Sequence, residues 1–213
     1  TASTGIASKI INGTTIHSWS GINIINDNDD FDTVYERVRK NKKKVKEWKT
    51  VDILVIDEIS LIDIKTLDIL NHIGQRIRNN SKPFGGIKLF IVGDFFQLPP
   101  VVGEYCFKYE EWEKIFDYKI NLLENHRSSD KYLIKILKRI RKGKYLGDKL
   151  ADKLESRISD EEHYPLLVPL RSMARKINAD KMLENSNKEY VFSANYHFDK
   201  DKPYIKDLIN KES

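Results

Sequence analysis

Two short apolar runs that end in carboxylate or amide side chains constrain the fold of this chain more than any other feature. The first, residues 51–56, leads into Asp57 and Glu58, and the second, residues 87–92, leads towards Gln97. Runs of this length are typical of buried strands. Open α/β sheets place their ligand chemistry at the carboxyl ends of such strands. The sequence therefore predicts an α/β fold with a functional site at these two strand ends.

The polar residues at the two strand ends suit nucleotide hydrolysis. At a strand tip, Asp57 could help to hold a hydrated Mg²⁺ while Glu58 accepts a proton from the attacking water. Asp94 and Gln97 stand beside a Pro-Pro pair that could hold the amide rigidly near a phosphate. Together these residues indicate a nucleotide-hydrolysing motor.

One element of such a motor is absent from the 213 residues. The chain nowhere contains Gly-x-x-x-x-Gly-Lys-Ser/Thr, the loop whose N–H groups and lysine cradle a triphosphate. It also begins without Met, at Thr1, in what reads as the end of a strand and a turn. We therefore expect an internal piece of a longer protein.

Composition indicates a globular chain. A hydrophobic content of 40% over 213 residues is ample for a core. A single cysteine, Cys106, excludes an internal disulfide and favours a reducing compartment, the nucleus or the cytosol. No apolar run approaches the roughly 18 residues that cross a bilayer, so we expect no membrane partner. The net charge of +5 permits a polyanionic partner, and the spacing of His and Cys does not predict a zinc site.

Periodicity predicts alternating helices and strands. We expect helices at residues 6–11, 32–48, 60–78, 130–141, from there to about 156, and 171–184, strands at 51–56, 87–92, 119–123 and 190–194, and a loop at 14–19. Asp130 is the expected cap of its helix and Gly143 the expected stop. A domain boundary is predicted near Asp117.

The motifs that carry a family resemblance cover nearly the whole chain. They occupy residues 1–7, 15–18, 55–60 and 84–101, and the most specific is Gly-Asp-Phe-Phe-Gln-Leu-Pro-Pro. In order and spacing they resemble the Pif-one family of ATP-dependent DNA helicases, of superfamily one B. The resemblance implies a RecA-like P-loop NTPase fold, with residues 1–117 as a first RecA-like domain lacking its phosphate-loop segment and 118–213 as part of a second. Late family motifs are absent.

The resemblance also implies the roles of individual residues around ATP and Mg²⁺. Asp57 would be the metal carboxylate, Glu58 the base that deprotonates water, and Gln97 the sensor of the γ-phosphate. Arg127 matches an arginine that reaches the γ-phosphate from the second domain. The family usually has Gln after this arginine, whereas this chain has Ser128.

On the DNA side, the resemblance implies a motor that moves 5′-to-3′ on single-stranded DNA and unwinds forked DNA. Thr1, Ser3, Thr4 and His17 match motifs that touch the single strand, where hydroxyl and backbone donors hold phosphates without reading bases. The resemblance further implies a monomeric motor with roles in DNA repair, recombination and telomere maintenance.

Several alternatives remain open at the level of sequence. Asp57 and Glu58 could instead cap the helix that follows, Arg127 could form a structural ion pair, and His17 could be an ordinary loop histidine. The basic stretch 37–46 suits either DNA tracking or a solvated helix face, and the three tryptophans suit either base stacking or packing. The chain as a whole could be a catalytically inactive DNA-binding remnant, or a clamp-loader-like ATPase that acts on protein.

Overall fold

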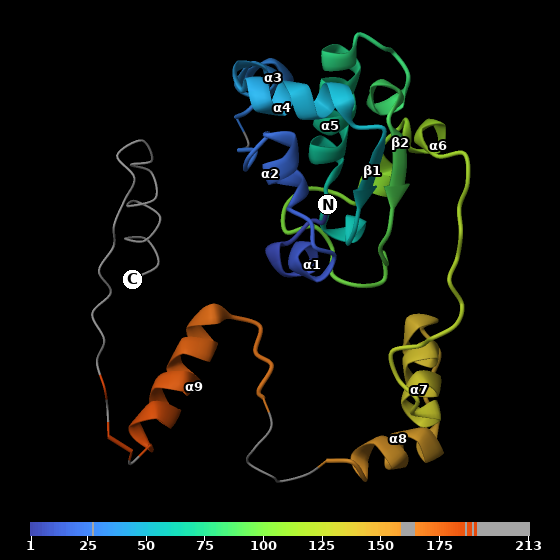
Figure 1. The fold of residues 1–213 in the computed structure, drawn as a ribbon. Coiled ribbons are helices and arrows are strands. Elements are labelled where there is room, and N and C mark those ends of the chain that lie inside the picture. Colours follow the sequence, from blue (N-terminus) through green and yellow to red (C-terminus); the bar gives the residue numbers. More distant parts are fainter. Residues whose placement is uncertain (27, 159–164, 186, 189, 191–213) are drawn as a thin grey trace. The chain divides into compact units, whose positions relative to one another are not determined.

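The computed structural model describes residues 1–26, 28–158, 165–185, 187–188 and 190. The chain divides into two compact units, and the first of them is Thr1–Leu154. It contains the sheet and almost all of the helices (Figure 1). In the second unit, which begins at Glu155, the structure describes helix α9, Arg171–Leu183, close to the predicted bounds.

The sheet pairs two strands in parallel. Strand β1, Ile53–Ile56, lies beside β2, Lys88–Ile91, in a register that places Ile56 opposite Ile91. Parallel neighbours need a crossover connection, which is supplied here by a long helix. On the other side of β1, Ala2 forms parallel bridges with Thr15 and with Asp57. The first residues of the chain therefore extend the sheet at the carboxyl end of β1.

The crossover helix α5, Ile64–Arg78, begins later than predicted. A 3-10 turn, Ile59–Leu61, comes first, and Asp63 then caps α5 by accepting the Thr66 N–H at 3.0 Å. The predicted start at residue 60 was wrong because this cap interrupts an otherwise continuous apolar pattern. The buried face of α5 carries the core residues Leu67, Ile69, Leu70, Ile73 and Ile77, as in an amphipathic helix.

A tight turn, Pro83–Gly86, packs directly on α5. A Cβ at Gly74 of α5 would lie 2.7 Å from the carbonyl carbon of Phe84, so only glycine allows this approach. The buried Asn71 side chain accepts the Phe84 N–H at 2.7 Å. These contacts hold the turn against α5, and β2 begins two residues after the turn, at Lys88.

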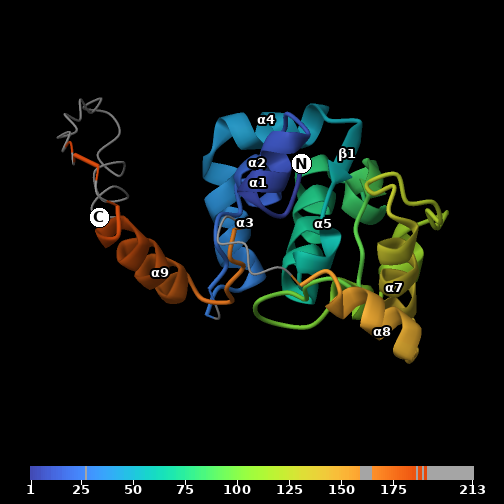
Figure 2. The same ribbon diagram turned by 90° about the horizontal axis from the view of Figure 1, so that it is seen from below.

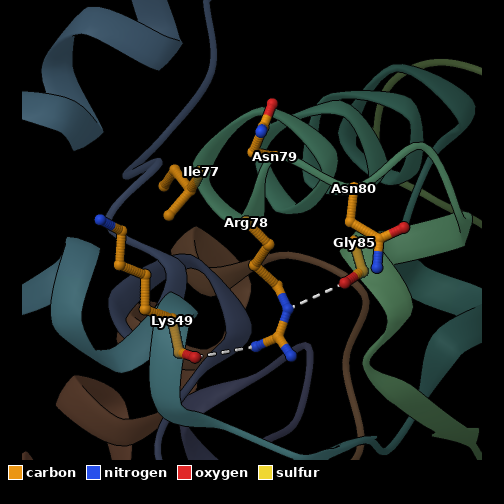
Figure 3. A pocket seen from close by; sticks show the side chains of 6 residues that line it. All are labelled: Lys49, Ile77, Arg78, Asn79, Asn80 and Gly85. Atoms are coloured by element: carbon orange, nitrogen blue, oxygen red, sulfur yellow. Dashed lines mark hydrogen bonds between the residues drawn. The ribbon is translucent and has the colours of Figure 1, made fainter.

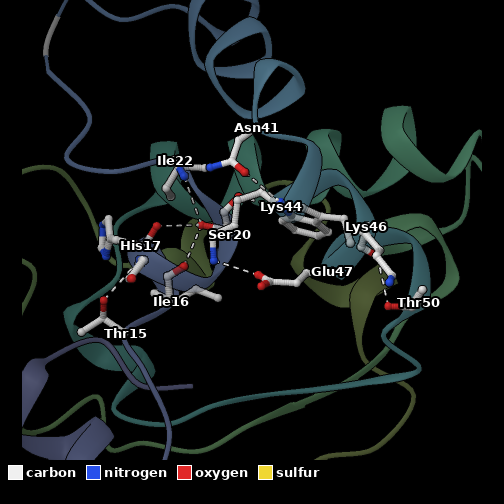
Figure 4. A network of polar contacts seen from close by, with 12 residues as sticks. Thr15, Ile16, His17, Ser20, Ile22, Asn41, Lys44, Lys46, Glu47 and Thr50 are labelled. Carbon is white, nitrogen blue, oxygen red and sulfur yellow. Dashed lines mark hydrogen bonds and ion pairs between the residues drawn. The ribbon is translucent and has the colours of Figure 1, made fainter. Parts of the chain in front are cut away.

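The first helix, α1 at Gly5–Ile10, lies where it was predicted, but the loop predicted at residues 14–19 was wrong. Residues Ile16–Ser20 form a short helix, α2, because the Thr15 hydroxyl accepts the Ser18 N–H at 3.2 Å and caps it. Figure 4 shows how the Ser20 hydroxyl donates back to the Ile16 carbonyl at 2.7 Å.

The single helix predicted at residues 32–48 was also wrong, because the chain forms two helices there. Helix α3, Phe31–Lys40, ends at Asn41, whose side chain then caps α4, Lys42–Thr50, by accepting the Lys44 N–H at 3.2 Å. A cap residue with extended backbone breaks the helix although both halves share a charged composition. Helix α3 lies beside α5 in both Figure 1 and Figure 2.

After β2 the chain forms short elements and then two longer helices. These are the 3-10 turn Cys106–Lys108 and the helices α6 (Trp112–Ile115), α7 (Lys131–Arg141) and α8 (Asp148–Glu155). Helix α7 has the predicted bounds because Asp130 caps it, accepting N–H groups of Tyr132 and Leu133. None of the helices in the described residues is long and apolar enough to cross a membrane.

The strand predicted at residues 119–123 was wrong. The structure assigns no strand there, and Ile120 and Leu122 are 85% and 84% exposed. An apolar run becomes a strand only when a neighbouring strand supplies hydrogen bonds, and none lies beside this run in the described chain. The strand predicted at residues 190–194 lies almost entirely outside the described residues.

Candidate functional site

The start of the chain is bound to the carboxyl end of β1. The Thr1 hydroxyl donates to the Val55 carbonyl at 2.7 Å, the Asp57 N–H donates to the Thr1 carbonyl at 2.9 Å, and the Ser3 N–H donates to the Asp57 carbonyl at 3.1 Å. These bonds bring two motifs that are more than fifty residues apart in sequence to one edge of the sheet.

Asp57 and Glu58 form the tip of β1, and both are half-buried. The Glu58 N–H donates to Asp57 Oδ1 at 2.9 Å, which fixes one carboxylate oxygen and leaves the other for a ligand. Glu58 has φ 54° and ψ 45°, the left-handed region that L-residues seldom adopt. Such strain at a strand tip is typical of functional sites.

The end of β2 joins the same edge. The Val92 N–H donates to the Ile56 carbonyl at 2.9 Å, and the Ile59 N–H donates to the Val92 carbonyl at 3.0 Å. A Cβ at Gly93 would lie 2.9 Å from the Ile59 nitrogen, so the glycine permits the close approach. Gly93 therefore lies against the backbone that directly follows the Asp57–Glu58 tip.

Asp94 organises the turn that carries Gln97. Its Oδ1 accepts the Phe96 N–H at 3.0 Å, its carbonyl accepts the Gln97 N–H at 2.9 Å, and its Oδ2 accepts from Gln97 Nε2 at 3.3 Å. Asp94 Oδ2 also forms an ion pair with Arg141 at the end of α7. The Arg141 guanidinium is the main reason that the pKa of the Asp94 carboxyl lies below its usual value.

Sequence reasoning did not identify Arg141 as part of this site. Its guanidinium also lies 4.6 Å from the centre of the Phe96 ring, so one residue of α7 contacts both the acid and an aromatic side chain of the turn. No local pattern in the sequence links residues 47 positions apart. The only sequence feature that points to Arg141 is its place among the basic residues at the end of the capped helix α7.

The four residues matched to DNA contacts lie at or near this edge. Thr4 Oγ1 accepts the Ala7 N–H at 3.2 Å and caps α1, while the buried Ser3 hydroxyl oxygen has no hydrogen-bond partner in the described part of the chain. His17 lies in α2, two residues after the Thr15 bridge to Ala2, and is half-buried. Burial lowers the pKa of its imidazole, and nearby Asp63 opposes this only in part.

Arg127 is not brought to this edge. It is exposed, and its backbone N–H donates to Asn125 Oδ1 at 2.9 Å. Within the described residues its guanidinium makes no hydrogen bond or ion pair with another group. The structure therefore places Asp57 and Glu58 at the tip of β1 and Gln97 in the turn that follows β2, and in the described chain Arg127 makes no side-chain contact with any of them.

The donor set at the tip of β1 fits a magnesium ion that keeps several waters. Mg²⁺ in nucleotide sites usually takes one or two carboxylates and completes its shell with water and phosphate oxygens. Asp57 offers a carboxylate of this kind. Among the described residues no three His, Cys, Asp or Glu side chains gather as a metal site.

The known proteins whose sequences resemble this chain are DNA helicases of the PIF1 type. The sequence model of PIF1-like helicases matches residues 1–146. ATP-dependent DNA helicase RRM3 of Saccharomyces cerevisiae is 43% identical over 155 residues, which is 70% of this chain and 21% of that protein. ATP-dependent DNA helicase Pif1 of Bdellovibrio bacteriovorus is 34% identical over 202 residues, which is 92% of this chain and 45% of that protein.

Solved structures give the same result for the fold. A crystal structure of Pif1 helicase from Candida albicans superposes with a TM-score of 0.77 at 32% identity, over 88% of this chain and 44% of that one. A structure of Bacteroides Pif1 bound to single-stranded DNA superposes with a TM-score of 0.68 at 26% identity, over 84% and 45%.

The predicted RecA-like α/β fold class is confirmed by these neighbours. The chain spans less than half the length of the relatives and structures it matches. Because the family model matches residues 1–146, well over half of the chain, the chain belongs to the family of PIF1-like helicases.

Proposed function

We propose that this chain is part of an ATP-dependent DNA helicase that moves 5′-to-3′ on single-stranded DNA and unwinds duplexes. The supporting observation is that residues 1–3 and the end of β2, which leads into the Asp94–Gln97 turn, are hydrogen-bonded to the segment that carries Asp57 and Glu58. The organisation that fits this function is a first RecA-like domain in residues 1–117 and part of a second in 118–213.

The nucleotide side of the proposal assigns a role to each polar group at the edge. Asp57 would help to hold Mg²⁺, which would neutralise charge on the phosphates of ATP. Glu58, whose carboxylate follows directly, would orient the attacking water and accept its proton. The Gln97 amide would exchange its bond to Asp94 for one to the γ-phosphate, so that the turn reports whether nucleotide is bound.

The DNA side is coupled to the nucleotide side by a direct contact. The Ser3 N–H donates to the Asp57 carbonyl at 3.1 Å, so a shift of the β1 tip moves the segment that would grip DNA. Thr1, Ser3 and Thr4 would offer hydroxyl and backbone donors to phosphates. His17, with its lowered pKa, would act there as a neutral hydrogen-bonding group rather than as a cation.

The finer functional assignments rest on the family. The proposed substrates are single-stranded and forked DNA, which appear in the titles of Pif1 structures similar to this chain. A monomeric motor inside the cell, in the nucleus or the cytosol, with roles in DNA repair, recombination and telomere maintenance, completes the proposal.

The second candidate function is a DNA-binding remnant that cannot hydrolyse ATP. It would hold DNA through the residues matched to DNA contacts, Thr1, Ser3, Thr4 and His17, without turning over nucleotide. The two candidates separate in a protein that carries this chain together with an upstream phosphate loop. DNA-stimulated ATP hydrolysis by that protein supports the helicase, and its absence supports the remnant. An ATPase that acts on protein alone would hydrolyse ATP without stimulation by DNA.

The decisive variant is Glu58→Gln in that longer protein. Loss of a general base typically costs about 10² to 10⁴ in rate, so ATP turnover should fall by at least about 10²-fold. Nucleotide binding should stay nearly intact, because the amide occupies the same volume. Asp57→Asn, as the comparison variant, should weaken Mg²⁺-nucleotide binding as well. If Glu58→Gln hydrolyses ATP at the original rate, the proposed role of this strand end is wrong.

A further inference from the structure

Helix α4 presents a face of lysines to the solvent. Lys42, Lys43, Lys46 and Lys49 are exposed, and with about 3.6 residues per turn they lie within about a third of the circumference of the helix. The opposite side carries Trp48, which is fully buried. We call these four residues the lysine face. From Lys42 to Lys49 it spans about 10 Å along the axis, roughly the rise of three phosphates on one DNA strand.

The positive charge of the lysine face is not compensated by neighbouring acids. The acidic residue of α4, Glu47, forms an ion pair with Lys44 at 2.8 Å, on the side of the helix away from the lysine face. On the adjoining α3, Glu36 pairs with Arg39 at 2.9 Å. Further acids near α3 are also paired with arginines, in the pairs Asp29–Arg37 and Asp32–Arg76. No ion pair to the lysine face occurs among the described residues.

An open hollow adjoins the lysine face and adds neutral donors to it. Lys49, Asn79, Asn80 and Gly85 line this hollow of about 430 Å³ (Figure 3). Arg78 also lies there, but its guanidinium is committed to backbone carbonyls, those of Trp48, Lys49, Val51 and Gly85. The free polar groups beside Lys49 are therefore amides, which can donate to phosphate oxygens without further charge.

The lysine face lies away from the edge that carries the proposed ATP and single-strand contacts. Helix α4 ends at Thr50, and β1 starts at Ile53, so the hollow beside Lys49 lies at the amino end of the strand. Asp57 follows the carboxyl end. Figure 1 shows α4 and α1 at opposite ends of β1. The lysine face is therefore a separate surface of the same compact unit.

The chemistry of this surface favours duplex over single-stranded DNA. Unpaired bases are usually held by stacking on exposed aromatic rings. Here the Trp48 indole is buried, donates to the Ser20 carbonyl at 3.0 Å and packs against Trp19 at 4.8 Å between ring centroids. The lysine face thus offers charge and hydrogen bonds for a phosphate backbone and no platform for bases.

We propose that the lysine face of α4 is a second DNA-binding surface, which contacts the phosphate backbone of duplex DNA. The proposal rests on the proposed function for its ligand, DNA. It adds a surface that is separate from the motif edge, by which we mean the edge of the sheet at the carboxyl end of β1. In an unwinding motor this surface would hold the paired part of a forked substrate while the motif edge holds the single strand.

The test uses the triple variant Lys42→Ala, Lys46→Ala, Lys49→Ala. Binding of the chain to a blunt duplex and to a single strand of equal length is measured by fluorescence anisotropy over a series of salt concentrations. If each lysine faces one phosphate, the slope of log K against log salt for the duplex should decrease in size by about 2.7, because each neutralised phosphate contributes about 0.9. Single-strand affinity should be unchanged.

Helix α7 offers a matched control with the same spacing, number and exposure of lysines. The variant Lys131→Ala, Lys135→Ala, Lys138→Ala removes an equal charge from exposed positions that are also four and three residues apart. It should keep the duplex slope of the unmodified chain. Thermal melting of both triple variants checks that the fold is retained, which the exposure of all six side chains predicts.

Three outcomes overturn the proposal: an unchanged duplex slope in the α4 variant, an equal loss in the α7 variant, or an equal loss for the single strand. The last would indicate general electrostatic attraction or a single-strand path across α4. If the α4 variant binds the single strand as the unmodified chain does and its duplex slope is unchanged, only the role of the lysine face is disproved. A chain that binds neither DNA argues against the proposed function itself.

Discussion

Glu58 combines a local chemical role with an unusual backbone. Its φ of 54° costs an L-residue roughly 1–2 kcal/mol, and the Asp57 side chain accepts its N–H in that conformation. The pattern of an apolar run ending in Asp-Glu was enough to predict where these carboxylates lie. The left-handed turn could not be predicted, because it leads into a hydrogen bond from the Ile59 N–H to the Val92 carbonyl, which joins segments that are distant in sequence.

His17 should make the stability of the fold depend on pH in a predictable direction. Burial lowers its pKa below 6.5, so near pH 6 the folded state binds fewer protons than the unfolded state. Stability is therefore fully present above the unfolded pKa and decreases as pH falls through it towards the folded pKa. His17→Gln should show a smaller loss of melting temperature than the unmodified chain between about pH 7.5 and pH 5.5.

A suitable control for this prediction is His126→Gln, which alters an exposed histidine in the segment before α7. It removes an imidazole that is not buried. If His17→Gln and the unmodified chain lose stability in parallel over the same pH range, burial of His17 is not the source of the effect.

At the scale of elements, the helix bounds that could be predicted are those marked by capping residues. Helix α7 has its predicted bounds because Asp130 at one end and Gly143 at the other are local signals. The break at Asn41 depends on an equally local cap, but the sequence is charged on both sides of it. The helix after Thr15 also has a local cap, but its five residues are too few to show a period. Periodicity alone therefore could not separate a continuous helix from two short ones.

Gly74 and Gly5 allow a test of how α5 is packed. Alanine normally stabilises a helix by up to about 1 kcal/mol relative to glycine. At Gly74 the added Cβ would lie 2.7 Å from backbone of the turn at Phe84, so Gly74→Ala should lower the free energy of unfolding by about 1–3 kcal/mol. Urea denaturation followed by circular dichroism measures the change.

Gly5 is the matched control, because a Cβ there meets nothing within 4 Å. Gly5→Ala should leave stability unchanged or raise it slightly, since it adds helix propensity at the start of α1 without a clash. Equal stability of the two variants would show that the turn at residues 83–86 moves aside easily, and that the contact does not fix the approach of β2.

At the scale of the molecule, the sequence predicted the α/β class and the strand end at which Asp57 and Glu58 lie, but not the contacts of the later helices. Thr1–Leu154 forms one compact unit that includes α7, so the predicted boundary near Asp117 falls inside it. The Asp94–Arg141 ion pair connects the two predicted domains within that unit. Contacts of this kind depend on how distant segments meet, which no local pattern encodes.

Arg127 tests whether the second predicted domain contributes to catalysis. If it acts as an arginine finger, Arg127→Ala in a protein that also carries the phosphate loop should lower ATP turnover by about 10³-fold or more, because the guanidinium neutralises charge that develops on the γ-phosphoryl group. DNA affinity without nucleotide should be unchanged. Arg127→Lys should restore activity only in part, since an ammonium lacks the planar fork that bridges two oxygens.

The alternative for Arg127 is a purely structural role, and its exposed position makes the two readings separable. A structural arginine would lower the melting temperature of Arg127→Ala while turnover per folded molecule stays the same. An exposed guanidinium without a partner in the described chain should instead leave melting almost unchanged, because surface charges contribute only about 0–1 kcal/mol. Melting temperature and turnover measured on one preparation therefore decide: a large loss of turnover at constant melting temperature requires that domain closure bring Arg127 to the nucleotide.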